Sequence, residues 1–388
     1  MPHAVMAVLI DFKSAFNRVN HNIVVTILSK MGVPGWLLRI VAGFLTHRVL
    51  IVRHRGLHSE KLDMPGSTPQ GTLLGLFLFL ILINSTGCGH PKDLIGKYAT
   101  SSLNIGVPLE KINLKYIDDM TQAFAFNVHE ITSQNNNPTL PLSYHERTGH
   151  IVSEGVQLDA QLEINRVIED CKMNEMVINI SKTKVMMFNT SRKRDFLPEL
   201  SIGTEHVLEV VSDHKLLGII VQEDLRWAKN TLNLCRRGFS RLWMLRRLRN
   251  IGASRQELCD VYIKQVRSVL EIAVPAWEPG LTKSEGGQLE RVQKSAFSII
   301  LGDEYVSYEH ALEELNLEKL SVRRSQICLK FAKKALKHPK YQSWFKENTA
   351  TSCTRARKNK LVPVNARTKR YERSPLPYLT HLLNLHLS

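Results

Sequence analysis

The pattern of hydrophobic and polar positions divides the chain into a mixed N-terminal part and a helical C-terminal part. The apolar run 4–10 ends at Asp11 and predicts a buried strand that delivers a carboxylate at its C-terminal end. Residues 20–30 have helical spacing, and Pro34 opens a second predicted helix. The loop PGSTPQG then leads into an apolar helix that begins at Thr72.

Short alternating runs around turn residues predict several strand pairs in the first half of the chain. We expect residues 49–53 to pair with 60–64, and 176–180 to pair with 184–188. We also expect a tight hairpin of two short strands at 115–121 and another hairpin around HKLLGIIV at 214–221. A helix with one apolar face is predicted around 160–171. Residues 131–155 are polar and rich in turn residues, and they predict a mobile insertion.

Beyond Trp227 the apolar spacing is helical almost throughout. One predicted helix carries Leu258, Val261, Tyr262, Val266 and Leu270 on one face, and the next is defined by the apolar positions of 289–299. Strands and helices mixed first, and helices later, predict an α+β domain followed by an all-α one.

Composition narrows the class of protein. A chain of 388 residues is long enough for two or three domains, and 43% hydrophobic residues exclude a disordered chain. The six cysteines are scattered with no C-x-x-C pair, which argues against a disulfide framework or a zinc module and fits a reducing compartment.

The net charge of +16 is concentrated in two blocks of the C-terminal half. Residues 226–270 carry a net +9 and residues 319–373 a net +15, so the remainder of the chain carries −8. Solvated basic helix faces are the simpler explanation. The first block, however, is arginine-rich and contains Trp227, Phe239 and Trp243, which favours contact with phosphates.

The sequence predicts no membrane segment. The apolar run LLGLFLFLILI at 73–83 has 11 residues, too few to span a bilayer, and a buried helix is the better interpretation. The N-terminus lacks the basic region of a signal peptide. We therefore expect an intracellular protein of the nucleus or cytoplasm that is not secreted.

Three aspartates are candidates for catalysis. Asp11 ends a predicted buried strand, and Asp118 and Asp119 stand side by side in a predicted hairpin. Adjacent carboxylates raise each other's pKa unless a cation lies between them, and a third carboxylate from a neighbouring strand completes a typical Mg²⁺ site. The alternatives are a solvated turn for the pair and a strand-end cap for Asp11.

Five sequence blocks change the weight of these alternatives. DFKSAF (11–16), GSTPQGTLLG (66–75), YIDDMT (116–121), NISKTK (179–184) and HKLLGI (214–219) follow one another in this order. The chain resembles the reverse transcriptases of non-LTR (LINE-type) retrotransposons of the jockey-like kind, in which such blocks are motifs A to E. Segments 261–277, 288–302 and 368–384 also resemble that family, so that the resemblance covers nearly the whole chain.

The resemblance implies an RNA-directed DNA polymerase, which extends a DNA primer on an RNA template with dNTPs and two Mg²⁺ ions, or Mn²⁺ in their place. It implies a palm at 1–190, a primer-grip hairpin and connection at 191–227, a helical thumb at 228–318 and a basic C-terminal region at 319–388. The palm would be a mixed or antiparallel sheet with helices on one face. The oligomeric state stays open.

The resemblance also assigns roles at the reaction centre. Asp11 and Asp118 would be the principal metal ligands, Asp119 would complete the carboxylate cluster, and the Phe12 carbonyl is a further candidate ligand. Phe16 would lie against the sugar and exclude a ribose 2′-hydroxyl, with core packing as the alternative.

Further residues would hold the nucleotide and the primer. Gln70 and Gly71 would line the nucleotide pocket, since a glycine lets the backbone approach a ligand closely, and Tyr116 would flank the primer end. Lys182 would neutralise or protonate the leaving pyrophosphate, with a surface turn residue as the alternative.

The primer grip and the duplex contacts follow the palm. Leu217 and Gly218 would form the primer grip. The helix after Trp227 would hold the duplex backbone through a group of arginines, namely Arg236, Arg237, Arg241, Arg246 and Arg247.

The chain departs from the family pattern in several ways. It begins ten residues before Asp11, so we expect the fingers, which hold the triphosphate in the family, to be missing and polymerase activity to be weak or absent. From the family pattern we also expect a chain without the endonuclease that precedes the palm and without the zinc knuckle that follows it. Lys13 and Ser14 are transposed relative to the family pattern D-x-x-K-A-F-D, and Asn17 replaces its second aspartate. Leu76 and Ser85 stand where the family usually has proline and aspartate, and segments 91–114 and 131–155 are longer than expected between the motifs. The alternative function is a non-catalytic nucleic-acid-binding remnant that keeps the basic thumb and tail.

Overall fold

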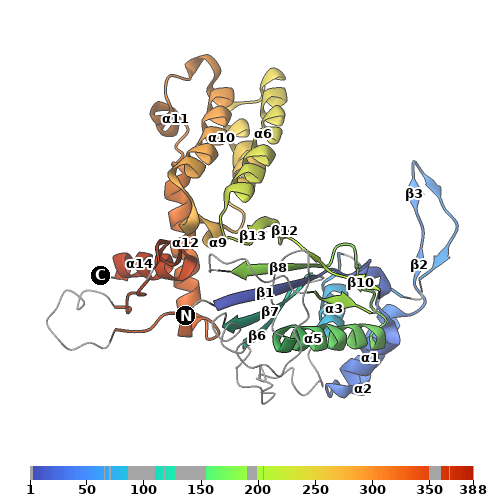
Figure 1. Cartoon of the computed structure of the whole chain (residues 1–388). Helices are drawn as coiled ribbons and strands as arrows, with labels where there is room; N and C mark the ends of the chain where they lie inside the picture. Colours follow the sequence, from blue (N-terminus) through green and yellow to red (C-terminus); the bar gives the residue numbers. More distant parts are fainter. Residues whose placement is uncertain are drawn as a thin grey trace. The chain divides into compact units, whose positions relative to one another are not determined.

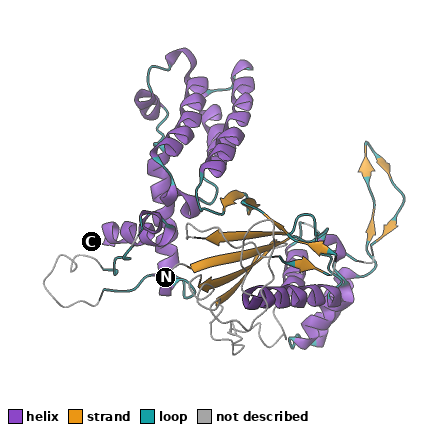
Figure 2. Cartoon of the chain, in the orientation of Figure 1, coloured by secondary structure: helices purple, strands orange, loops and turns teal. Residues whose placement is uncertain are grey.

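The chain separates into two compact units, each described here by itself (Figure 1). The computed structural model describes residues 3–64, 66–69, 71–85, 110–116, 119–127, 154–189, 199–203, 205–348, 360–366 and 368–387. We call Met1–Ser212 the sheet unit and Asp213–Ser388 the helical unit. The predicted mixed α+β class is confirmed, with the strands concentrated in the first unit and the helices in the second (Figure 2).

A five-stranded sheet organises the sheet unit, with the strand order β11-β8-β1-β7-β6. Its strands are β1 (His3–Ile10), β6 (Glu110–Tyr116), β7 (Asp119–Asn127), β8 (Lys184–Asn189) and β11 (Glu209–Val210). All neighbours pair antiparallel except β11 and β8, which are parallel. The apolar run of β1 fits its central place, because Met6 to Ile10 are all buried.

Among the described residues of this unit, four helices cover the apolar core, and Figure 1 shows them grouped beside the sheet. They are α1 (His21–Lys30), α2 (Gly35–Leu45), α3 (Leu73–Ser85) and α5 (Glu154–Met173). Asn20 caps α1 by accepting hydrogen bonds from the backbone N–H groups of Asn22 and Ile23. The apolar helix α3 buries Leu78, Phe79 and Leu82 completely, which confirms the prediction of a buried helix there.

Short strand pairs complete the sheet unit. One hairpin pairs β2 (Val49–Leu50) with β5 (Leu62–Asp63), and β3 (Arg53–His54) with β4 (Leu57–His58), around Gly56 as predicted. A smaller pair joins β9 (Ser201–Ile202) to β10 (His206–Val207).

The helical unit begins with the predicted hairpin of β12 (Asp213–Leu216) and β13 (Ile219–Gln222). Its longer helices are α6 (Ala228–Asn250), α7 (Arg255–Val261), α10 (Lys283–Leu301), α11 (Tyr308–Glu314), α12 (Leu320–Lys337) and α14 (Pro375–Leu387). Shorter turns are a π segment (Tyr262–Arg267), α8 (Ser268–Leu270), α9 (Val274–Trp277) and α13 (Lys369–Glu372). α6 packs against α10, and α12 packs against α9, α10 and α14 around a common core.

Three local predictions are corrected. Residues 176–180 form no strand, since only an isolated bridge joins Ile178 to Phe12 before the chain turns. The two strands of the 115–121 hairpin are long, with seven residues in β6 and nine in β7. The helix predicted over 258–270 contains the π segment, which keeps Leu258, Tyr262 and Val266 on the buried side.

The two predicted insertions lie mostly outside the described residues. Of segment 91–114, residues 110–114 belong to β6, and of segment 131–155, residues 154–155 begin α5. Within the part of the chain that the structure describes, no helix is both long and apolar enough to cross a bilayer.

Candidate functional site

The strand register brings Asp11 and Asp119 to facing positions at one end of the sheet. Ile10 of β1 pairs with Met120 of β7, so the next residue on each strand is an aspartate. Tyr116 pairs with Asp119 in the β6–β7 hairpin, and residues 117 and 118 between them lie outside the described residues. Asp118 therefore comes directly before Asp119 along the chain, and Tyr116 ends the neighbouring strand β6.

The segment 179–183 closes over Asp11. Asn179 donates a side-chain hydrogen bond of 3.0 Å to Asp11 Oδ2, and Lys182 Nζ lies 3.7 Å from the same oxygen. The Asp11 side chain is 27% exposed and that of Lys182 is 70% exposed, so both can be reached from solvent. The structure thus joins the first and fourth sequence blocks at one carboxylate.

Main-chain hydrogen bonds fix that contact. The Asn179 N–H donates to the Asp11 carbonyl at 2.7 Å, and the Lys13 N–H donates to the Val177 carbonyl at 2.8 Å. Phe12, between them, is buried in the core of the sheet unit. The position of Asp11 is therefore set by backbone groups on both sides, whatever its own side chain binds.

The second sequence block is also tied to the segment after Asp11. The Ser67 N–H donates to the Val19 carbonyl at 3.0 Å, and the Thr68 N–H donates to the Phe16 carbonyl at 3.0 Å. His21 Nε2 lies 2.7 Å from the Ser67 carbonyl oxygen, which also accepts a 2.9 Å hydrogen bond from Arg48.

Positive φ angles mark the same loop. Ser67 has a φ of 81° and Gly71 a φ of 85°, a region that glycine adopts without strain and serine rarely does. The two hydrogen bonds on its carbonyl hold Ser67 in this conformation. Gln70, the other predicted nucleotide-pocket residue, lies outside the described residues.

Gly75 lets helix α3 begin close under this loop. A Cβ at Gly75 would lie 2.3 Å from the Pro69 carbonyl oxygen and 2.8 Å from Thr72 Oγ1. Thr72 accepts a 3.1 Å hydrogen bond from the Gly75 N–H and donates one of 2.9 Å to the Pro69 carbonyl. A glycine is required here because only it permits so close a backbone approach.

Phe16 packs against the core. Its ring stacks on Phe79 of α3 with the centroids 4.2 Å apart, and the side chain is partly buried. This is the packing alternative given for Phe16, and the sugar contact stays a prediction.

The predicted primer-grip residues form the two-residue turn between β12 and β13. Leu217 has a φ of 47° and Gly218 a φ of 89°, the pattern of a type I′ turn, and Leu217 is 47% exposed. An exposed leucine in the left-handed region costs conformational energy, on the order of 1–2 kcal/mol, that asparagine or glycine there largely avoids.

One face of α6 combines arginines with exposed aromatic rings. The helix contains seven basic residues and no acidic one. Trp243 is 58% and Phe239 44% exposed, and at helical spacing they fall on the same side as Arg236, Arg246 and Arg247. These five residues are called the α6 face. Its three arginines form no ion pair with any described residue.

The other two predicted arginines lie at the flank of α6. Arg241 donates to the Gln265 carbonyl, and Arg237 is half-buried with a guanidinium nitrogen that has no hydrogen-bond partner. Arg241 is therefore engaged within the unit, whereas the α6 face is free to meet a partner.

Some groups at these sites were not singled out by the sequence. Asn179 is part of a predicted block, but its contact with Asp11 has no sequence signal beyond the turn it begins. His21 and Arg48 lie outside every block, and no spacing rule links them to Ser67. Among the described residues no three metal-binding side chains gather in one place.

The solved structures that resemble this chain do so at low similarity. No known family model matches the chain, and no curated protein matches it. Telomerase of Candida tropicalis, solved with a TWJ fragment of telomeric RNA, has a TM-score of 0.33 and 9% identity over 81% of this chain and 49% of that one. The corresponding telomerase complex of Candida albicans has a TM-score of 0.33 and 10% identity over 87% of this chain and 48% of that one. The chain thus spans about half the length of these telomerase chains, and similarity at this level does not by itself assign a function.

Proposed function

We propose that the chain is the polymerase region of a reverse transcriptase of the non-LTR, jockey-like kind, with the sheet unit as palm and the helical unit as thumb and basic C-terminal region. The observation that carries the proposal is the register of β1 and β7, which faces Asp11 with Asp119 beside Asp118. The ordered sequence blocks and the closure of 179–183 over Asp11 support it.

The donor set suits Mg²⁺. Asp11, Asp118 and Asp119 would supply carboxylate oxygens, which are the ligands that this hard cation prefers. When bound, the metal makes the primer hydroxyl a better nucleophile and offsets the negative charge of the departing pyrophosphate.

The chain's own groups do the positioning. Asn179 donates to Asp11 Oδ2 and so fixes the direction in which the other carboxylate oxygen points. Lys182 holds an exposed ammonium near the same carboxylate, where it can neutralise pyrophosphate or give it a proton. In the reaction the primer 3′-oxygen would bond to the α-phosphorus of a dNTP and lose its proton to solvent, while the bond from that phosphorus to the bridging oxygen breaks and pyrophosphate leaves.

Further groups would bind the nucleotide and the duplex. Gly71 and Gln70 would admit the dNTP, the Leu217–Gly218 turn would hold the primer end, and the α6 face would hold the duplex backbone. The template would be RNA and the primer DNA.

A primer-extension assay tests the proposal. The purified chain is given an RNA template, a labelled DNA primer, dNTPs and Mg²⁺ or Mn²⁺, and is compared with the variants Asp11→Asn and Asp118→Ala. Asparagine can still accept the hydrogen bond from Asn179, so the fold should be kept. We expect incorporation to fall at least about 100-fold in either variant.

The control is Asp63→Asn, an exposed aspartate of β5 in the same unit. It should leave incorporation unchanged. Template-dependent incorporation that survives both Asp11→Asn and Asp118→Ala would refute the assignment of the carboxylates.

The α6 face favours a second candidate, a nucleic-acid-binding protein without catalysis. That function predicts binding that falls steeply with salt and is indifferent to substitutions of Asp11 and Asp118. Salt-dependent binding that Asp11→Asn and Asp118→Ala leave unchanged, with no incorporation by the wild-type chain, would favour it over the polymerase.

A further inference from the structure

The second basic surface of the helical unit lies on α12. This helix carries six basic residues and no acidic one. The arginines are engaged, because Arg323 binds Glu271 and Arg324 binds Glu278. Four lysines in the last part of the helix are exposed and form no ion pair with a described residue, namely Lys330, Lys333, Lys334 and Lys337.

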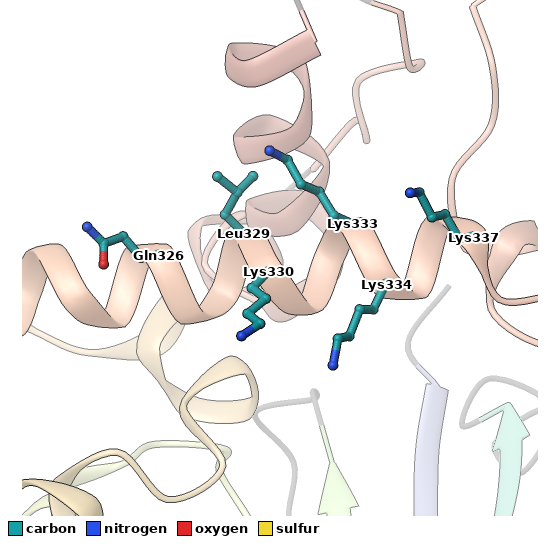
Figure 3. Close-up of a pocket in the computed structure, with 6 residues that line it drawn as sticks. All are labelled: Gln326, Leu329, Lys330, Lys333, Lys334 and Lys337. Carbon is teal, nitrogen blue, oxygen red and sulfur yellow. The ribbon is translucent and has the colours of Figure 1, made fainter.

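These lysines stand in two rows. Figure 3 shows Lys330 and Lys334 pointing to one side of α12 and Lys333 and Lys337 to the other. With Gln326 and Leu329 they line a hollow of about 360 Å³. Two rows of ammonium groups along one helix suit a chain of phosphates better than a single anion, and their spread over two helical turns covers about 10 Å.

An aromatic ladder follows the lysines directly. The rings of His338 and Tyr341 are 5.0 Å apart, and those of Tyr341 and Trp344 are 4.8 Å apart. Lys340 Nζ lies 5.8 Å from the Tyr341 ring centroid. The ladder ends at Trp344, which is 44% exposed, so an accessible flat ring follows the lysine rows along the chain.

We infer that the two lysine rows and Trp344 form a binding site for a single-stranded polynucleotide, separate from the α6 face. Lysines bind the phosphates without reading sequence, and an exposed aromatic ring stacks on an unpaired base. A duplex keeps its bases inside and cannot use Trp344, and an acidic membrane offers charge without a base to stack. The inference does not depend on the polymerase activity, because it concerns binding alone.

Fluorescence anisotropy of the full chain tests the site with labelled 20-nucleotide oligo(U) and oligo(dT). The variant Lys330→Gln/Lys333→Gln/Lys334→Gln/Lys337→Gln removes four charges and keeps side-chain length. We expect affinity to fall about 100-fold at 0.1 M salt and the slope of log affinity against log salt to become shallower by about 3, since each phosphate contact on a single strand contributes about 0.7.

Three further variants separate the effects of charge, of stacking and of the α6 face. Replacement of the same four lysines by arginine keeps the charge and should restore binding to within about threefold, and Trp344→Leu should weaken it about tenfold. Arg236→Gln/Arg246→Gln/Arg247→Gln on the α6 face should reduce duplex binding more than single-strand binding. Circular dichroism confirms that each variant is folded.

Other results would overturn the inference. Unchanged oligonucleotide binding in the four-lysine glutamine variant would refute the site. So would lysine-dependent binding that is tighter to a 20-base-pair duplex, or to vesicles of phosphatidylcholine and phosphatidylserine, than to either oligonucleotide. Failure of primer extension with intact lysine-dependent binding would count against polymerase activity of this chain and leave this site standing.

Discussion

The two units hold their functional groups in different ways. In the sheet unit the candidate site is anchored by the main chain: the Asn179 N–H binds the Asp11 carbonyl, and the Thr68 N–H binds the Phe16 carbonyl. In the helical unit the interior is tied by side chains, such as Tyr262 with Gln293 and Arg324 with Glu278.

This difference determines what a substitution can do. Main-chain hydrogen bonds persist through most side-chain substitutions. They are lost only where the backbone itself requires glycine or a positive φ. A side-chain anchor fails as soon as one partner is removed, because the other is left buried and unpaired. The outward faces of the helices are held in neither way, since their charged side chains make no contact on which the fold depends.

Removal of the buried Arg324 should give the largest effect on stability. Arg324 is 3% exposed and lies 2.5 Å from a carboxylate oxygen of Glu278. Arg324→Leu leaves Glu278 buried without its cation, and we expect a loss of about 3–5 kcal/mol in the free energy of unfolding at neutral pH. Urea unfolding followed by tryptophan fluorescence measures it.

The loss should depend on pH. Burial raises the pKa of Glu278 above its ordinary value of 4.5, and Arg324 opposes that rise. Without Arg324 the pKa of Glu278 in the folded variant rises further. The contribution of Glu278 to the variant's free energy of unfolding is therefore kept in full below pH 4.5 and is lost as the pH rises through the pKa of Glu278 in the folded state. The control Arg255→Leu, which breaks only exposed ion pairs, should cost about 0–1 kcal/mol.

Neutralisation of the α6 face should separate binding from stability. Arg236→Gln/Arg246→Gln/Arg247→Gln removes three charges that the fold does not use. We expect duplex affinity to fall about 100-fold at 0.1 M salt, with a slope shallower by about 2.7. The free energy of unfolding should change by less than about 0.5 kcal/mol.

The matched control for this variant lies on the hairpin of the sheet unit. Arg53→Gln/Arg55→Gln/Lys61→Gln removes three exposed charges from another surface. An equal loss of duplex affinity in both triple variants would show that only net charge matters and would remove the special role of α6.

Apolar runs and apolar spacing predicted much of the fold and the placement of the candidate residues. The continuous apolar runs before Asp11 and in α3, and the spacing of α1, each bury their side chains against one core, and such burial leaves an apolar run or a repeat in the sequence. The predicted strand that ends at Asp11 and the hairpin at Asp119 were correct, but their mutual register depends on a contact between distant segments.

The contacts that the sequence did not predict follow no periodic pattern. The clamp of His21 and Arg48 on the Ser67 carbonyl joins three segments with no shared spacing. The apolar spacing of four in 258–270 drifts by about 40° per step on an α-helix, and the π segment absorbs that drift. A sequence pattern shows the drift but does not say how the backbone resolves it.

Gly75→Ala tests the main-chain anchoring of the sheet unit at a position where an added side chain would meet the backbone. The new Cβ would meet the Pro69 carbonyl oxygen, which is backbone and cannot rotate away. We expect a loss of about 1–3 kcal/mol in the free energy of unfolding, measured in urea. In the control Gly43→Ala the Cβ in α2 meets nothing within 4 Å, so the variant should gain up to about 1 kcal/mol. Equal stability of the two variants would contradict the close approach.

The turn at Leu217 and Gly218 is a place in the helical unit where conformation of the backbone, and not a side-chain partner, is the constraint. Asparagine tolerates the left-handed region better than leucine, so Leu217→Asn should raise the free energy of unfolding by about 0.5–1 kcal/mol. If the exposed leucine side chain contacts the primer end, the same variant should lower primer extension while it raises stability. Opposite changes in these two measurements would show that the strain at Leu217 is kept for function, because a purely structural leucine would be replaced without loss. A gain in stability with unchanged extension would remove Leu217 from the proposed primer grip and leave the turn as a structural feature.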